Sequence, residues 1–127
     1  MKIWTMLALA APLLAFAPAA HAEEDEPNGI DCNNAVAQLD MNICADKDYR
    51  KADAELNAVY RDTMHGLDKH SQDLLRASQR EWIKFRDAEC TYVSAQNEGG
   101  SIYPMVYYGC MTTMTRDRIK QLKAGQQ

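Results

Sequence analysis

The chain has 127 residues, with 14 basic and 18 acidic side chains and a formal net charge of −4. This length provides for one domain with a modest hydrophobic core. The acidic balance argues against nucleic acid as a partner, because nucleic-acid binding depends on lysine and arginine contacts with phosphates.

The first 22 residues have the three-part layout of an export signal. Lys2 precedes an apolar run from Met6 to Ala17, and the small-residue ending Ala20-His21-Ala22 follows. The run is shorter than the roughly 20 residues of a membrane-spanning helix, and Cys32 is too far from the cleavage point to carry a lipid anchor. We expect residues 1–22 to be removed. The mature protein, with 13 basic and 18 acidic residues and a net charge of −5, would be periplasmic or secreted without a membrane anchor.

Residues 23–39 form an acidic tail that offers little to bury, and residues 40–127 form the expected helical domain. Apolar or small side chains recur in steps of three and four along residues 49–67, which predicts a helix over 41–66 with Asp40 as its N-cap. A similar pattern predicts a second helix over 72–96, capped by Ser71. Its predicted buried stripe consists of Leu75, Ser78, Trp82, Phe85, Glu89 and Tyr92.

A third helix is predicted over 103–123, with Pro104 in its first turn. The short connection between the first two helices predicts an antiparallel hairpin. In that register Asp53 and Arg86 lie at one level, so we expect them to form an ion pair. The fold class is therefore all-α, an antiparallel three-helix bundle.

Four cysteines in an exported chain predict two disulfide bonds. A hairpin of the second and third helices brings Cys90 and Cys110 to one level, which leaves Cys32 to pair with Cys44. The spacing lacks the close cysteine pairs of zinc sites, so no metal is expected there. Each disulfide closes a short loop and would stabilise the fold by about 3 kcal/mol in the chain-entropy model.

No pattern in the chain predicts catalysis or a cofactor. The histidines His65 and His70 lie in a charged turn, where solvated side chains are the simpler interpretation. Carboxylates two residues apart on a helix point in different directions and do not form an acid–base pair. Met111 and Met114 have the spacing of a soft copper site, but the same spacing serves core packing, which we favour. We expect a protein that is not an enzyme.

A set of aromatic, charged and cysteine positions in all three helices resembles the LprI-like lysozyme-inhibitor family, from about residue 32 to residue 122. The matching positions are Cys44, Tyr49, Asp53, Leu56-Asn57, Tyr60, Leu74-Leu75, Ser78-Gln79-Arg80, Trp82, Phe85-Arg86-Asp87, Cys90, Gly100-Ser101, Cys110, Arg118 and Leu122. The resemblance implies an exported helical domain that binds a protein partner, with lysozyme inhibition as the function of the family's characterised branch. The alternative is an envelope immunity or adaptor protein, also non-catalytic, that binds another partner.

The connection between the second and third helices is the candidate partner-binding segment. It contains Asn97, Glu98, Gly99, Gly100, Ser101 and Tyr103. A flexible glycine step, a carboxylate and a rigid aromatic side chain are what a loop needs to enter a polar enzyme cleft. The simpler interpretation is that these glycines only make a tight connection between helices.

Overall fold

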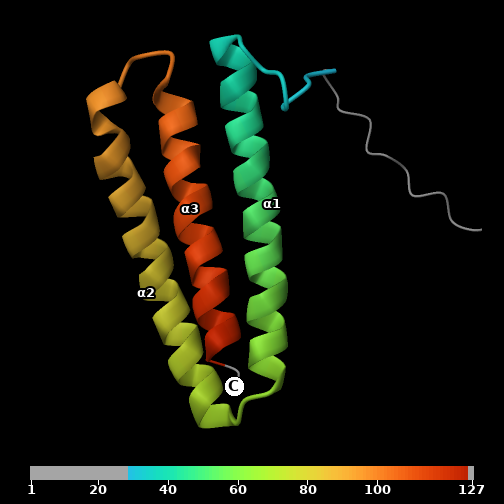
Figure 1. Cartoon of the computed structure of the whole chain (residues 1–127). Coiled ribbons are helices and arrows are strands. Elements are labelled where there is room, and N and C mark those ends of the chain that lie inside the picture. The colour runs from blue at the N-terminus through green and yellow to red at the C-terminus, as the bar shows by residue number, and fades with distance from the viewer. Residues whose placement is uncertain (1–28, 126–127) are drawn as a thin grey trace, which may run out of the picture.

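The computed structural model describes residues 29–125, which form three helices. Helix α1 spans Gln38–His65, α2 spans Lys69–Ser94 and continues into the short 3-10 helix η1 (Ala95–Asn97), and α3 spans Tyr103–Ala124 (Figure 1). The described residues contain no β-strand, so the all-α fold class is confirmed. The expected signal, residues 1–22, and residues 23–28 of the acidic tail lie outside the described residues. Within residues 29–125, no helix is long and apolar enough to cross a membrane.

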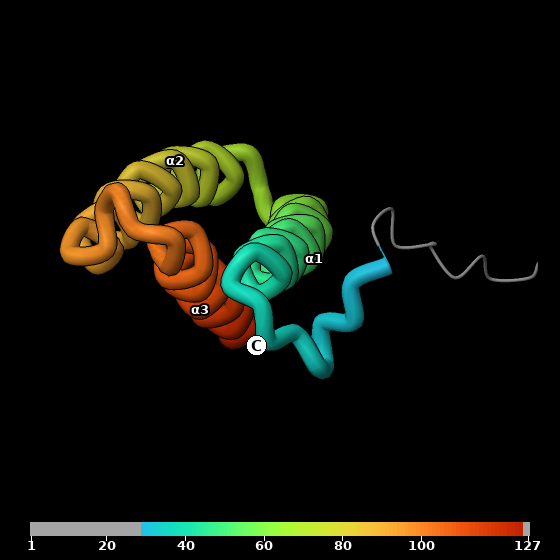
Figure 2. The backbone as a smooth tube through the Cα atoms, turned by 90° about the horizontal axis from the view of Figure 1, so that it is seen from above, coloured from blue at the N-terminus to red at the C-terminus, as the bar shows by residue number. Residues whose placement is uncertain are grey.

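Helix α3 lies between α1 and α2 in the view of Figure 1, and the closest backbone packing is between α1 and α3. The turn at residues 66–68 reverses the chain, but α1 and α2 diverge away from it (Figures 1 and 2). From α2, the Trp82 ring extends to Arg118 of α3 and the Arg86 side chain extends to Asp53 of α1. Two helices separated by side chains of this size cannot pack closely along their whole length.

Both predicted N-caps of the first two helices are wrong. Ala37 occupies the cap of α1 without a side-chain hydrogen bond, and Asp40 lies inside the first turn, where its charge still favours the helix dipole. In α2 the cap is Asp68, whose carboxylate accepts hydrogen bonds from Ser71 N at 3.0 Å and Ser71 Oγ at 2.9 Å. Both helices therefore start three residues earlier than predicted, and residues 38–39 of the expected tail are helical.

The core lies where α1 and α3 pack against the N-terminal half of α2. Leu56, Ile119 and Leu122 are buried at its centre. Partly buried apolar side chains surround this cluster: Val59, Tyr60, Leu75 and Trp82. Ala52, Cys90 and Met111 are buried as well, which makes six buried apolar side chains among residues 29–125. Because so few apolar side chains are fully enclosed, the disulfide bonds carry a large share of the stability of a domain this small.

The predicted buried stripe of α2 is wrong at three of its six positions. Ser78 is exposed, and its neighbour Gln79 is buried. Phe85 is 59% exposed and Tyr92 is 76% exposed, whereas Arg86 and Cys90 are buried. The stripe is rotated by about one residue, which turns a helix by about 100°. A periodicity argument places the apolar side chain inward, but here the cysteine in a disulfide and an arginine with several partners occupy the interior.

Candidate functional site

The connection between α2 and α3 is an ordered turn closed by its own backbone. Glu98 N donates to Ala95 O at 3.1 Å, Gly100 N donates to Asn97 O at 2.9 Å, and Tyr103 N donates to Gly100 O at 3.2 Å. Gly99 has φ +77°, a left-handed conformation that favours glycine. We call residues 97–103 the α2–α3 turn. Residues 98–101 of it are exposed.

The α2–α3 turn is fixed to the first turns of α1. Asn42 Nδ2 donates to the carbonyl oxygen of Ser101 at 2.8 Å, and Gln38 Nε2 donates to Asn42 Oδ1 at 3.0 Å. The sulfur of Met105 lies 3.9 Å from Gln38 Nε2. Sequence reasoning missed Gln38 and Asn42, because nothing in the local pattern shows that α1 packs against α3.

Exposed apolar side chains lie at the same end of the bundle. Val36 lies just before α1, Leu39 lies in its first turn, and Ile102 belongs to the α2–α3 turn. Figure 1 shows that the start of α1 and this turn are at one end of the molecule. Exposed apolar residues beside polar loop groups are typical of protein contact surfaces.

Four tyrosines continue from this turn in a chain of ring contacts. Tyr103 stacks on Tyr107 with ring centres 6.1 Å apart, Tyr107 meets Tyr108 edge-on at 5.4 Å, and Tyr108 stacks on Tyr49 of α1 at 5.8 Å. All four are partly buried. Burial raises the pKa of the Tyr49 and Tyr107 hydroxyls, and the nearby Asp87 carboxylate raises the pKa of both further. These hydroxyls are therefore protonated hydrogen-bond donors at neutral pH.

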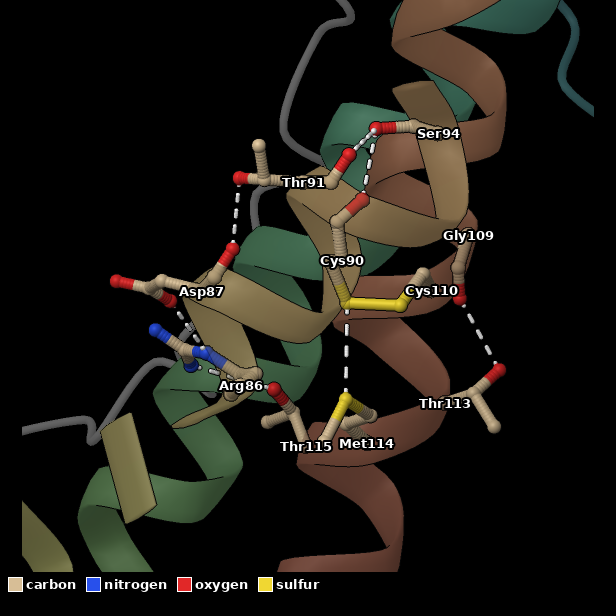
Figure 3. The surroundings of a disulfide bond; sticks show 10 residues. All are labelled: Arg86, Asp87, Cys90, Thr91, Ser94, Gly109, Cys110, Thr113, Met114 and Thr115. Carbon is tan, nitrogen blue, oxygen red and sulfur yellow. Dashed lines mark hydrogen bonds and ion pairs between the residues drawn. A yellow bond between two sulfur atoms is a disulfide. The ribbon is translucent and has the colours of Figure 1, made fainter. Parts of the chain in front are cut away.

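Arg86 connects all three helices at the inner end of the tyrosine chain. Its Nη1 lies 3.4 Å from Asp53 Oδ1 on α1 and 3.4 Å from Thr115 Oγ1 on α3, and its Nε donates to Asp87 Oδ1 at 2.9 Å. The guanidinium also lies 5.5 Å from the ring centre of Tyr49 and 5.1 Å from that of Trp82. Figure 3 shows Arg86 beside Asp87 and Thr115. Asp53 and Arg86, expected to pair from the hairpin register, are in contact.

The two disulfide bonds have the pairing expected from the sequence, Cys32–Cys44 and Cys90–Cys110. Cys90 is fully buried, and Met114 Sδ lies 3.6 Å from its sulfur (Figure 3). This bond joins α2 to α3 below the turn, so it fixes the two helices that present residues 97–103. The other bond ties the segment before α1 to the same end of the bundle.

A second surface feature lies on the outer side of α2 and α3. It is an open groove of about 490 Å³, lined by Phe85, Glu89, Val93, Val106, Gly109, Cys110, Thr113 and Met114. The exposed Phe85 belongs to this groove and not to the core. The lining of the groove shares no residue with the tyrosine chain.

The histidines His65 and His70 are expected from the sequence to be solvated side chains near a charged turn. His65 and His70 are exposed and lie near the α1–α2 turn, at the other end of the bundle from residues 97–103 (Figure 1). Among residues 29–125 no group of three or more histidine, cysteine or acidic side chains is placed to hold a metal ion. Of the methionines, Met111 is buried and Met114 contacts the disulfide, which is the packing role expected for them.

A family model described as lysozyme inhibitor LprI matches residues 32–122. The uncharacterized protein R02472 of Rhizobium meliloti (strain 1021) is 43% identical over 124 aligned residues, covering 87% of each chain. The uncharacterized protein YecT of Escherichia coli (strain K12) is 27% identical over 113 residues, covering 73% of this chain and 70% of that protein. No solved structure matches. The family match contains all four cysteines, the Arg86 contacts and the α2–α3 turn, and the chain therefore belongs to the LprI lysozyme-inhibitor family.

Proposed function

We propose that the mature chain is an exported, non-catalytic protein-binding domain that inhibits a lysozyme. The observation that carries the proposal is the match of the lysozyme-inhibitor family model over residues 32–122, which includes nearly all of the described bundle. The net charge of −5 expected for residues 23–127 adds support, because an acidic protein associates faster with cationic lysozymes.

We propose the α2–α3 turn, residues 97–103, as part of the contact surface. Glu98 and Ser101 are exposed there, and Tyr103 begins α3 directly below them. The hydrogen bond from Asn42 and the Cys90–Cys110 bond hold the turn in place. A turn that is already ordered loses less conformational entropy on binding, which favours affinity.

Inhibition assays on a panel of lysozymes test this function. The wild-type protein should inhibit at least one lysozyme, and a Glu98→Ala, Ser101→Ala, Tyr103→Ala variant should inhibit it at least about tenfold less, the effect of losing about 1.4 kcal/mol of binding energy. Circular dichroism checks that the variant is folded. Phe85→Ala changes the groove, whose lining contains none of residues 97–103, and is the control that should inhibit like the wild type.

The outcomes separate the two parts of the proposal. Equal inhibition by the wild type and the folded triple variant would reduce residues 97–103 to a connector. Absence of inhibition across the panel by folded wild-type protein would refute lysozyme as the partner. Export is tested separately, since mass spectrometry of protein recovered from the periplasm or medium should find Glu23 as the first residue.

A further inference from the structure

Arg86 contacts two carboxylates, those of Asp53 and Asp87, and also the ring of Tyr49 in the tyrosine chain. The Arg86 side chain is only 6% exposed, whereas those of Asp53 and Asp87 are 38% and 50% exposed. The positive charge is therefore inside the bundle, and both negative charges reach the surface. The three groups together carry a formal charge of −1, and the negatively charged groups are the ones that are exposed to solvent.

Each carboxylate is held in place but keeps binding capacity. Asp53 Oδ1 contacts Arg86, and Asp53 Oδ2 accepts a bond of 3.2 Å from the exposed Asn57. Asp87 Oδ1 accepts from Arg86 Nε, and Asp87 Oδ2 has no hydrogen bond among residues 29–125. An ionised carboxylate has about four lone-pair sites, so both residues can accept further hydrogen bonds. Groups that are already oriented lose little entropy when a ligand binds.

The tyrosines beside these carboxylates are also incompletely satisfied. Within residues 29–125, the structure gives no hydrogen-bond partner to the hydroxyls of Tyr49, Tyr103, Tyr107 or Tyr108. Each ring is fixed by its neighbours. Rigid tyrosines supply large contact areas at low entropic cost and are enriched at the centres of protein interfaces. Because Tyr103 also belongs to the α2–α3 turn, the tyrosine chain is continuous with the contact surface proposed above.

We propose that Tyr107, Tyr49, Asp53 and Asp87 form a second part of the contact surface, which receives an arginine or lysine side chain of the protein partner. This inference rests on the proposed function and specifies the chemistry of the partner. A guanidinium or ammonium group makes charge-assisted hydrogen bonds with ordered carboxylates. The adjacent rings of the tyrosine chain would pack against the aliphatic part of the same arginine or lysine side chain. Arg86 positions both carboxylates and does not touch the partner.

Removing the two exposed charges is the direct test. An Asp53→Asn, Asp87→Asn variant keeps acceptor oxygens for Arg86 but loses both negative charges. With the lysozyme that the wild type inhibits, calorimetry should show at least a tenfold higher Kd and a weaker dependence of Kd on salt. A Tyr107→Ala variant should also weaken binding, by about fivefold or more, without changing the salt dependence.

The matched control is Asp117→Asn. Asp117 is an exposed carboxylate of α3 whose ion pair within residues 29–125 is with Lys120, and it lies ten residues beyond Tyr107, about 15 Å along the helix. This variant should change Kd by less than about twofold. If Asp117→Asn weakens binding as much, per charge removed, as the double variant does, the effect is one of overall charge and the site is refuted. Unchanged binding by the folded double variant would also refute it.

A titration by nuclear magnetic resonance separates this inference from the lysozyme proposal. If no lysozyme is inhibited, the proposed function fails, and the full mature chain labelled with ¹⁵N is titrated with a hexa-arginine peptide. Localised amide shifts at Tyr49, Asp53, Asp87 and Tyr107 would support a cation-binding surface. Shifts confined to residues 97–103, scattered over all acidic residues, or absent would overturn it.

Discussion

Replacing Arg86 with alanine should lower the stability of the bundle by about 3 kcal/mol. Removing one partner of a deeply buried ion pair costs about 3–5 kcal/mol, because a charge is left without solvent or partner. Here the Asp53 and Asp87 side chains are 38% and 50% exposed, so water can replace the guanidinium around them. The ion-pair share is then close to the ~0–1 kcal/mol of exposed pairs.

The larger share comes from packing. Loss of the guanidinium contacts with the Tyr49 and Trp82 rings removes about 1 kcal/mol each. The shortened side chain leaves space between the three helices, and at ~24 cal/mol per Å³ a void of about 50 Å³ costs about 1 kcal/mol more. Together these contributions correspond to a fall of roughly 15 °C in melting temperature for a domain of about 100 residues.

Urea and thermal denaturation followed by circular dichroism at 222 nm measures this change. Asp53→Asn is the informative comparison, since it removes the ion pair between Asp53 and Arg86 but leaves the guanidinium against both rings, and should cost at most about 1 kcal/mol. Arg86→Lys should lie between the two, because an ammonium keeps the charge but cannot contact Asp53, Asp87 and both rings at once. The reasoning fails if Asp53→Asn costs as much as Arg86→Ala, or if Arg86→Ala melts within about 2 °C of the wild type.

Three further predictions concern the helices. Replacing Cys90 and Cys110 with alanine should cost about 3 kcal/mol or more, measured by urea denaturation, because a 20-residue loop is no longer closed and a fully buried contact is lost; an unchanged midpoint would contradict it. Hydrogen bonds from Ser71 lower the pKa of Asp68, so its capping contribution is present above the unfolded pKa of about 4 and is lost as the pH falls through the lower folded value. Asp68→Ala should therefore melt below the wild type at pH 7, with a difference that shrinks below about pH 4; a difference that stays constant down to pH 2 would argue against the cap. Phe85→Ala should change stability by less than about 1 kcal/mol, and a loss as large as that of a core phenylalanine, about 3 kcal/mol or more, would show that Phe85 is buried.

The sequence alone predicts the number of helices, their order and the pairing of the cysteines. Each of these depends on local information. A spacing of three and four residues defines a helix, the glycines at 99 and 100 mark a turn, and equal distances from that turn bring Cys90 and Cys110 to one level. The ion pair between Asp53 and Arg86 was predicted in the same way, from the register of the hairpin formed by the first two helices.

The tertiary structure alone decides how each helix is rotated and which neighbour it packs against. Hydropathy favoured Phe85 as a buried residue, but Arg86 is buried in its place, because Asp53 and Thr115 of the other helices satisfy its charge and hydrogen bonds. A helix does not encode in its own sequence the partners that another helix brings. For the same reason the sequence did not predict the hydrogen bond from Asn42 to Ser101, which orders the candidate binding turn, because that bond depends on the packing of α1 against α3.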